Sequence, residues 1–184
     1  MAEGEKKRRV RDIRLYRLLA DEDLVELWER VEPEIDPETG EEVYPSPEEN
    51  MRMVLRRVAE VLDRSGNVVN VKRLVDELEF REKQAPTVLG HRIAIPHVRS
   101  KNARELTVCF LRFPEGIELP GPEGPEIINF IFGIITPIYE DDTDYQKVYR
   151  RLVRLYKDDP SLAQELEEMT FPGEIVRIFR VREL

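Results

Sequence analysis

The chain has 184 residues, of which 41% are hydrophobic and 36% are charged, and its net charge at pH 7 is −9. This length suits one domain with a single core. The acidic balance excludes a general nucleic-acid binder, because phosphate contacts need a basic face. A single cysteine, Cys109, excludes an internal disulfide and a thiolate zinc cluster, and its apolar neighbours favour a buried strand position.

Turn and helix signals divide the first half of the chain. We expect residues 1–12 to form a flexible charged tail, whose basic run at 6–9 is more typical of a solvated segment than of a binding arm. Apolar spacing predicts a short helix over 21–30, and four prolines predict a surface loop or small hairpin over 32–47. The sequence Ser46-Pro47-Glu48-Glu49 is a strong helix start. It predicts a helix that ends near Arg64, followed by a second helix over 71–82.

The second half alternates from strands to helices. Short apolar runs predict strands over 93–96, 106–113 and 127–136, the last of them covered on both faces. The segment 114–125 is expected to be a turn region, and helices are expected over 144–157, 162–169 and 174–181. This order predicts an α/β layered fold. No segment reaches the roughly 18 apolar residues of a membrane span and no signal-peptide pattern opens the chain, so we expect a cytoplasmic protein without membrane insertion.

The segment from Arg81 to His97 carries most of the functional information. The chain has only two histidines, and His97 directly follows a proline at the edge of a short apolar run. A neutral imidazole is a competent nucleophile near neutral pH, and Arg81 can supply a permanent forked positive charge. Backbone N–H groups of the turn from Thr87 to Gly90, or those just after His97, can complete an anion nest. This layout is typical of a phosphate-handling loop, and it offers no metal-ligand spacing.

The same segment resembles the IIA subunits of the bacterial sugar phosphotransferase system, in their fructose, mannitol and nitrogen-regulatory branch. That family carries an Arg-Glu pair, a threonine, a Gly-Asn-Gly turn and then Ile-Ala-Ile-Pro-His. Here Arg81-Glu82, Thr87, Gly90 and the run Ile93-Ala94-Ile95-Pro96-His97 match in register. The resemblance covers residues 46–182 as a core and places the domain over 13–184.

The resemblance implies a single domain with a mixed, about five-stranded sheet and helices on both faces. It implies that His97 is the phosphoryl acceptor and that Arg81 contacts the phosphoryl group, with no cofactor. The expected donor is an HPr-like phosphocarrier. The expected recipient is a IIB subunit, or in a regulatory member a transporter or sensor kinase whose binding depends on the phosphorylation state of His97.

The chain also departs from the family pattern. His91 and Arg92 replace the asparagine and second glycine of the turn, and Arg92 there can add a phosphate contact or narrow the access to His97. Many relatives carry a second histidine where this chain has Tyr145, whose hydroxyl can orient an imidazole or donate to phosphate. These departures favour a regulatory use over sugar transport. A dedicated IIA subunit and a vestigial partner-binding module remain alternatives, Arg81 can be a simple helix-terminus charge, and Thr87 can be a simple turn residue.

Overall fold

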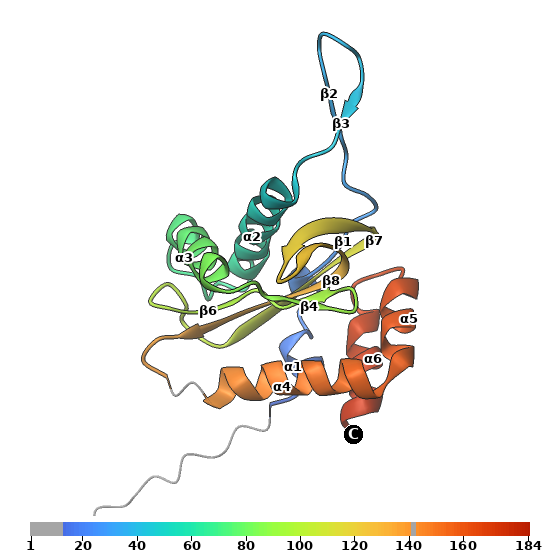
Figure 1. The fold of residues 1–184 in the computed structure, drawn as a ribbon. Coiled ribbons are helices and arrows are strands. Elements are labelled where there is room, and N and C mark those ends of the chain that lie inside the picture. The colour runs from blue at the N-terminus through green and yellow to red at the C-terminus, as the bar shows by residue number, and fades with distance from the viewer. Residues whose placement is uncertain (1–12, 141–142) are drawn as a thin grey trace, which may run out of the picture.

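A mixed six-stranded sheet separates two layers of helices in the computed structural model (Figure 1), which describes residues 13–140 and 143–184. The strand order is β1-β7-β8-β5-β4, with β6 also paired to β8. The strands are β1 (Val25–Leu27), β4 (Val88–Gly90), β5 (Ile93–Ala94), β6 (His97–Ser100), β7 (Thr107–Gly121) and β8 (Gly124–Pro137). The predicted tail over 1–12 lies outside the described residues. The expected α/β architecture with helices on both faces is confirmed, with one strand more than expected.

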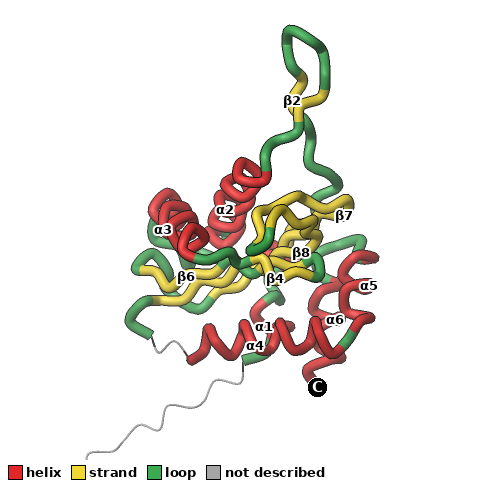
Figure 2. The backbone as a smooth tube through the Cα atoms, viewed as in Figure 1, coloured by secondary structure: helices red, strands yellow, loops and turns green. Residues whose placement is uncertain are grey.

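Two layers of helices flank the sheet (Figure 2), and each layer packs over its own hydrophobic core. One layer consists of α2 (Pro47–Asp63) and α3 (Val71–Gln84), and the other of α1 (Leu15–Leu18), α4 (Thr143–Asp158), α5 (Pro160–Glu168) and α6 (Glu174–Glu183). Strand β8 serves both cores because alternate residues of a strand face opposite sides of the sheet. Ile131 and Ile135 belong to the α2 side, whereas Phe130 and Phe132 belong to the α4 side. The prediction of a strand covered on both faces is therefore confirmed.

Local signals set the start of the first long helix. The hydroxyl of Ser46 accepts from the N–H of Glu49 at 3.2 Å, and the carboxylate of Glu49 accepts from the N–H of Ser46 at 2.8 Å. This reciprocal pair is a capping box, which satisfies two backbone donors that the first turn would otherwise leave unpaired. The helices predicted over 71–82, 144–157, 162–169 and 174–181 are also present, each within a few residues of its expected bounds.

The helix predicted over 21–30 is wrong. A short 3-10 turn over Glu22–Leu24 is followed by β1, which pairs in parallel with the edge of β7. The carboxylate of Glu26 on β1 binds the guanidinium groups of Arg57 on α2 and of Arg64, the residue that follows α2. The strand thus depends on pairing and side-chain contacts with distant segments, which local apolar spacing does not report.

The turn region predicted over 114–125 is also wrong, because β7 and β8 form one long antiparallel hairpin. The strands stay paired from Thr107↔Ile135 to Gly121↔Gly124, with a register shift between Arg112 and Ile117. Gly116 lies in this shift with φ +81°, and a Cβ atom there would lie 2.4 Å from the Ile127 side chain. The glycine therefore permits a bulge rather than a chain reversal.

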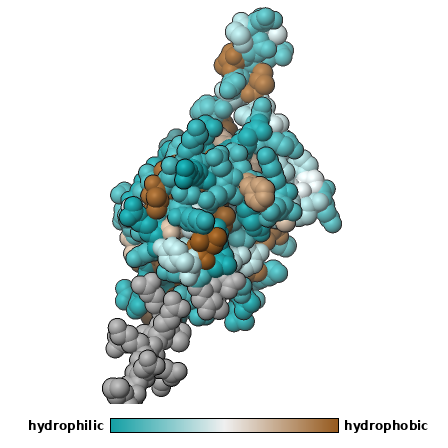
Figure 3. Space-filling model, turned by 90° about the vertical axis from the view of Figure 1, so that its left-hand side faces the viewer, coloured by the Kyte–Doolittle hydropathy of each residue, from teal (hydrophilic) through white to brown (hydrophobic). Residues whose placement is uncertain are grey.

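Residues 32–47 contain a small hairpin, formed by β2 (Glu34–Ile35) and β3 (Glu42–Val43), as the prolines predicted. It projects away from the sheet and its helices (Figure 1). Figure 3 shows apolar patches on this projection, and a few on the body, across a face that is otherwise largely hydrophilic; Ile35 and Val43 of the projection are exposed. None of the helices in the described part of the chain is both long and apolar enough to cross a bilayer.

Candidate phosphoryl-transfer site

Three elements bring the candidate residues together beside β8. Arg81 lies in the last turn of α3, His97 is the first residue of β6, and Tyr145 lies in the first turn of α4. Strand β6 pairs in parallel with β8, and the carbonyl of Pro96 accepts from the N–H of Ile134 at 2.9 Å. Proline has a fixed φ and lacks a backbone N–H, but its carbonyl can still accept a hydrogen bond. Pro96 therefore holds the backbone before His97 rigid without breaking the sheet.

A backbone carbonyl two residues before His97 holds its imidazole in one orientation. Its Nδ1 lies 2.7 Å from the carbonyl oxygen of Ile95. A carbonyl oxygen only accepts hydrogen bonds, so Nδ1 carries the proton and Nε2 is the nitrogen that carries the lone pair. Nε2 lies 3.2 Å from Nη2 of Arg81. The nucleophilic nitrogen therefore faces a fixed positive charge.

The surroundings of His97 favour its neutral form. The residue is 8% exposed, and burial lowers the pKa of its imidazole because water no longer stabilises the charged form. The guanidinium of Arg81 lowers that pKa further, while the hydrogen bond to Ile95 opposes the shift. The lowered pKa favours the neutral imidazole, which is the form that a nucleophile needs.

Two tyrosines of α4 pack against the imidazole. The Tyr145 ring stacks on His97 with centroids 5.1 Å apart and an interplanar angle of 29°, and the Tyr149 ring meets it edge-on at 5.6 Å. Both contacts fix the plane of the imidazole and exclude water from one side of it. Tyr149 was missed in the sequence, although it lies one helical turn after Tyr145 and so shares its face.

Arg81 and Thr87 also connect the helix end to the strand that leads to His97. Nη1 of Arg81 donates to the carbonyl of Ala85 at 3.0 Å. The N–H and hydroxyl of Thr87 donate to the carboxylate of Glu82 at 2.9 and 2.6 Å, and the Thr87 carbonyl accepts from the N–H of Ile95 at 3.0 Å. Both donors of Thr87 are engaged within the chain, so its geometry is that of a positioning residue.

Gly90 and Arg92 lie apart from His97, at the turn that joins β4 to β5. Gly90, His91 and Arg92 all have positive φ, at 78°, 53° and 72°, a conformation that costs a residue with a Cβ atom about 1–2 kcal/mol. The guanidinium of Arg92 binds Asn129 at 2.8 Å and Glu167 at 2.9 Å. The turn predicted over 87–90 lies slightly later in the chain, because residues 88–90 form β4 and the chain reverses at 91–92.

An open cavity of about 530 Å³ leads to His97. It is lined by Asp76, Glu77, Phe80, Arg81, Gln84, His97, Val98, Arg99 and Tyr145. Phe80 in this lining is 65% exposed, so an apolar side chain lies at the surface beside the cavity. Within residues 13–140 and 143–184, no three metal-ligating side chains gather in one place.

Residues 41–181 match the family model described as "Phosphoenolpyruvate-dependent sugar phosphotransferase system, EIIA 2". The chain is 24% identical over 133 residues to the "PTS system 2-O-alpha-mannosyl-D-glycerate-specific EIIABC component" of Escherichia coli, covering 72% of this chain and 20% of that protein. It is 29% identical over 129 residues to the "Multiphosphoryl transfer protein" of Salmonella typhimurium, covering 68% and 32%. The chain thus spans between a fifth and a third of the length of these relatives.

Solved structures with the same fold include two with different named roles. The nitrogen regulatory protein IIA-Ntr of Neisseria meningitidis has a TM-score of 0.64 at 21% identity, covering 84% of this chain and 91% of that one. IIA mannitol of Escherichia coli has a TM-score of 0.63 at 22% identity, covering 85% and 96%. At these identities the likeness establishes the fold, and the mixed sheet with helices on both faces is common to them.

Proposed function

This chain belongs to the EIIA type 2 family of the phosphoenolpyruvate-dependent sugar phosphotransferase system, and we propose that it is a phosphohistidine carrier whose acceptor atom is Nε2 of His97. The observation that carries the proposal is the pair of contacts on one imidazole. Nδ1 is committed to the Ile95 carbonyl at 2.7 Å, which leaves Nε2 as the nucleophile beside Arg81.

The transfer step needs no proton movement at His97. The Nε2 lone pair attacks the phosphorus atom of a donor phosphohistidine, forming one N–P bond as the donor's N–P bond breaks. The donor imidazole leaves with the electron pair of the broken bond. The proton of His97 stays on Nδ1, where it remains hydrogen-bonded to the Ile95 carbonyl oxygen. Arg81 stabilises the negative charge on the equatorial oxygens, and the tyrosine packing keeps the ring aligned for in-line attack.

The proposed donor is an HPr-like phosphocarrier, which reaches His97 through the open cavity beside Phe80 and Arg99. A macromolecular donor suits this site because its reactive nitrogen lies under an open rim rather than in a closed pocket. A solved complex of "enzyme IIAMTL and phosphorylated enzyme IIBMTL" shares the fold, with a TM-score of 0.64 at 23% identity. A IIB subunit is therefore one candidate recipient.

We favour a regulatory use of the phosphoryl group over a sugar-transport use. The support is Tyr145, which stacks on His97 at the position where many family members carry a second histidine. A tyrosine there supplies a hydroxyl to the transfer site in place of a second imidazole. In this use, a transporter or sensor kinase binds the chain according to the phosphorylation state of His97. The alternative is a IIA unit that donates to a sugar-specific IIB cysteine, which the likeness to a mannosyl-glycerate EIIABC component favours. A vestigial partner-binding module is the third possibility.

Phosphorylation of the purified chain tests this proposal. The chain is incubated with Enzyme I, HPr and phosphoenolpyruvate, and intact mass is measured beside His97→Ala and the exposed-histidine control His91→Ala. We expect a gain of one acid-labile phosphoryl group in the wild type and in His91→Ala, and none in His97→Ala. No gain in the wild type would contradict the carrier function. With the phosphorylated chain, onward transfer to IIB proteins of the same organism would support the sugar-transport use, and its absence would support the regulatory use.

A further inference from the structure

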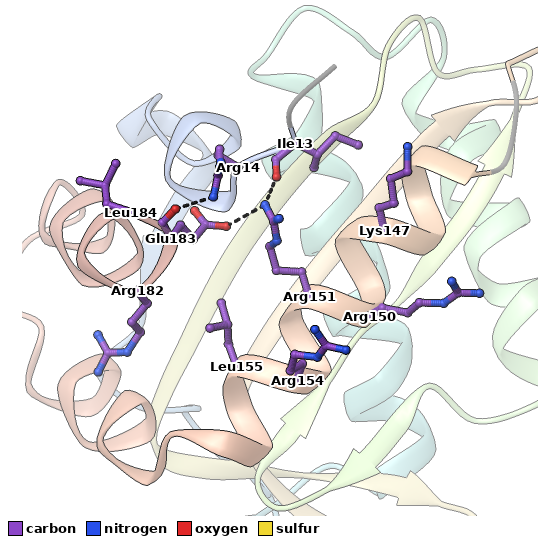
Figure 4. Close-up of a pocket in the computed structure, with 10 residues that line it drawn as sticks. All are labelled: Ile13, Arg14, Lys147, Arg150, Arg151, Arg154, Leu155, Arg182, Glu183 and Leu184. Carbon is purple, nitrogen blue, oxygen red and sulfur yellow. Dashed lines mark hydrogen bonds and ion pairs between the residues drawn. The ribbon is translucent and has the colours of Figure 1, made fainter. Parts of the chain in front are cut away.

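A second cavity, of about 630 Å³, lies between α1, α4 and α6 (Figure 4). Its lining holds six cationic side chains, from Arg14, Lys147, Arg150, Arg151, Arg154 and Arg182, and one side-chain carboxylate, that of Glu183. This concentration of positive charge occurs in a chain whose net charge is −9. A basic hollow on an acidic protein concentrates anions locally, because low-dielectric walls focus the field.

Three of these cations are held in place and form the walls of the cavity. Arg151 reaches from α4 to the carbonyl of Ile13 and to the Glu183 carboxylate, at 3.4 Å from the latter (Figure 4). Arg14 donates to the Glu183 carbonyl. Arg182 is committed to other carboxylates, those of Asp159 at 2.6 Å and Glu165 at 2.8 Å. Glu183 itself accepts from the first N–H groups of α1, so these contacts join the three helices.

The other three cations, Lys147, Arg150 and Arg154, lie on exposed turns of α4 and have little compensating charge among the residues that the structure describes. Lys147 lies 3.5 Å from Asp144, and the side chain of Arg150 donates to the neutral amide of Gln146 at 3.4 Å. Arg154 makes no hydrogen bond or ion pair with any residue that the structure describes. Their spacing of three and four residues brings like charges together on one helix face, which destabilises the helix unless an anion binds there.

The location separates this cavity from the phosphoryl-transfer site. Tyr145 and Tyr149 turn one face of α4 toward His97, and Val148 and Leu152 on that side are buried. Successive residues of a helix turn by 100°, so Lys147, Arg150 and Arg154 fall on the face of α4 opposite to the two tyrosines. A ligand of the cavity therefore does not compete with the chemistry at His97.

The geometry points to a binding site for an organic polyphosphate of nucleotide size. Guanidinium groups bind phosphoryl oxygens through paired N–H donors, so Arg150 and Arg154, with Lys147, suit a chain of phosphoryl groups. The cavity volume falls in the range of small-molecule sites. Ile13 and Leu155, on the side of α4 toward α1 and α6, add an apolar wall on which a ring system can pack, while Arg150 extends from the other side of the helix (Figure 4).

Titration calorimetry with ATP, ADP and tripolyphosphate at low salt tests this site. We expect ATP to bind more tightly than ADP and tripolyphosphate, and Arg150→Gln/Arg154→Gln to weaken ATP binding by at least about tenfold. The matched control is Arg56→Gln/Arg73→Gln, which removes the same charge from exposed arginines of α2 and α3. The control pair should change binding by less than about twofold, and added salt should weaken binding by the wild type.

Amide NMR shifts during the ATP titration should centre on α1, α4 and α6. The assignment would be overturned if ATP showed no saturable binding, or if both variant pairs lost binding equally. It would also be overturned if tripolyphosphate bound as tightly as ATP, because the apolar wall would then have no ligand. Shifts centred on Arg81 and His97 would move the site to the first cavity and contradict the inference.

Discussion

Replacing Arg81 with methionine separates the two roles that its guanidinium has in the site. One arm, Nη2, lies 3.2 Å from Nε2 of His97, and the other, Nη1, donates to the Ala85 carbonyl at 3.0 Å. Losing one preorganised donor at developing charge slows a reaction by about 10²–10³-fold, or about 2.7–4 kcal/mol. Because the same N–H also holds the Nε2 lone pair in the resting state, removing it frees the nucleophile and offsets part of that loss. We therefore expect a decrease near 10²-fold.

The lost contact to Ala85 is exposed, so the free energy of unfolding should fall by at most about 1 kcal/mol. Rapid-quench transfer from phosphorylated HPr gives the rate, and urea denaturation gives the stability. Arg73→Met is the matched control, since Arg73 is exposed on the same helix and does not line the cavity. If Arg81→Met transferred within about threefold of the wild type, Arg81 would be a helix-terminus charge only. Equal slowing of both variants would indicate long-range steering instead of a contact.

Three further predictions concern the imidazole of His97, the packing of β8 against α2 and the turn between β4 and β5. The NMR titration of His97 should have its midpoint below the ordinary imidazole value of about 6.5, and Arg81→Met should raise it, because the guanidinium charge lowers that pKa. Since the folded-state pKa is lowered, the stability contributed by neutral His97 is complete above about pH 6.5 and is lost as the pH falls toward the folded value; an unshifted midpoint would contradict this. Gly133→Ala should cost about 1–3 kcal/mol, because its Cβ would lie 2.4 Å from the Val58 side chain; Val58→Ala should recover part of this in a double-mutant cycle measured in urea. Arg92→Gly should be more stable than Arg92→Ala by about 1 kcal/mol, because both lose the side-chain contacts and only glycine relieves the positive φ; equal stabilities would exclude strain at this turn.

Parts of the fold that local chemistry determines could be predicted from the sequence. The cap at Ser46 and the apolar spacing after it gave the bounds of α2 nearly to the residue. Strand β1 could not be found in this way, because its three residues are stabilised by pairing with β7 and by ion pairs to α2. The long hairpin was missed for a related reason. Its prolines and Gly116 resemble turn residues, but β8 pairs with β7 on both sides of the bulge, from Thr107↔Ile135 to Gly121↔Gly124, and this pairing overrides them.

The candidate site divides in the same way. The motif identified His97 and Arg81, and the structure brings their side chains together with Tyr145. Spacing could not show that the Ile95 carbonyl holds Nδ1, since that contact depends on how the chain bends between β5 and β6. Nor could it show that Arg92 turns toward Glu167, which is 75 residues away in sequence.

The most direct test of the account is to determine which nitrogen carries the phosphoryl group. The chain is labelled with ¹⁵N, phosphorylated by Enzyme I, HPr and phosphoenolpyruvate, and examined by long-range ¹H–¹⁵N correlation of the histidine rings. We predict that phosphorylation shifts Nε2 of His97 and leaves Nδ1 protonated on the Ile95 carbonyl. A phosphoryl group on Nδ1, or on either nitrogen of His91, would contradict the proposed orientation of the nucleophile.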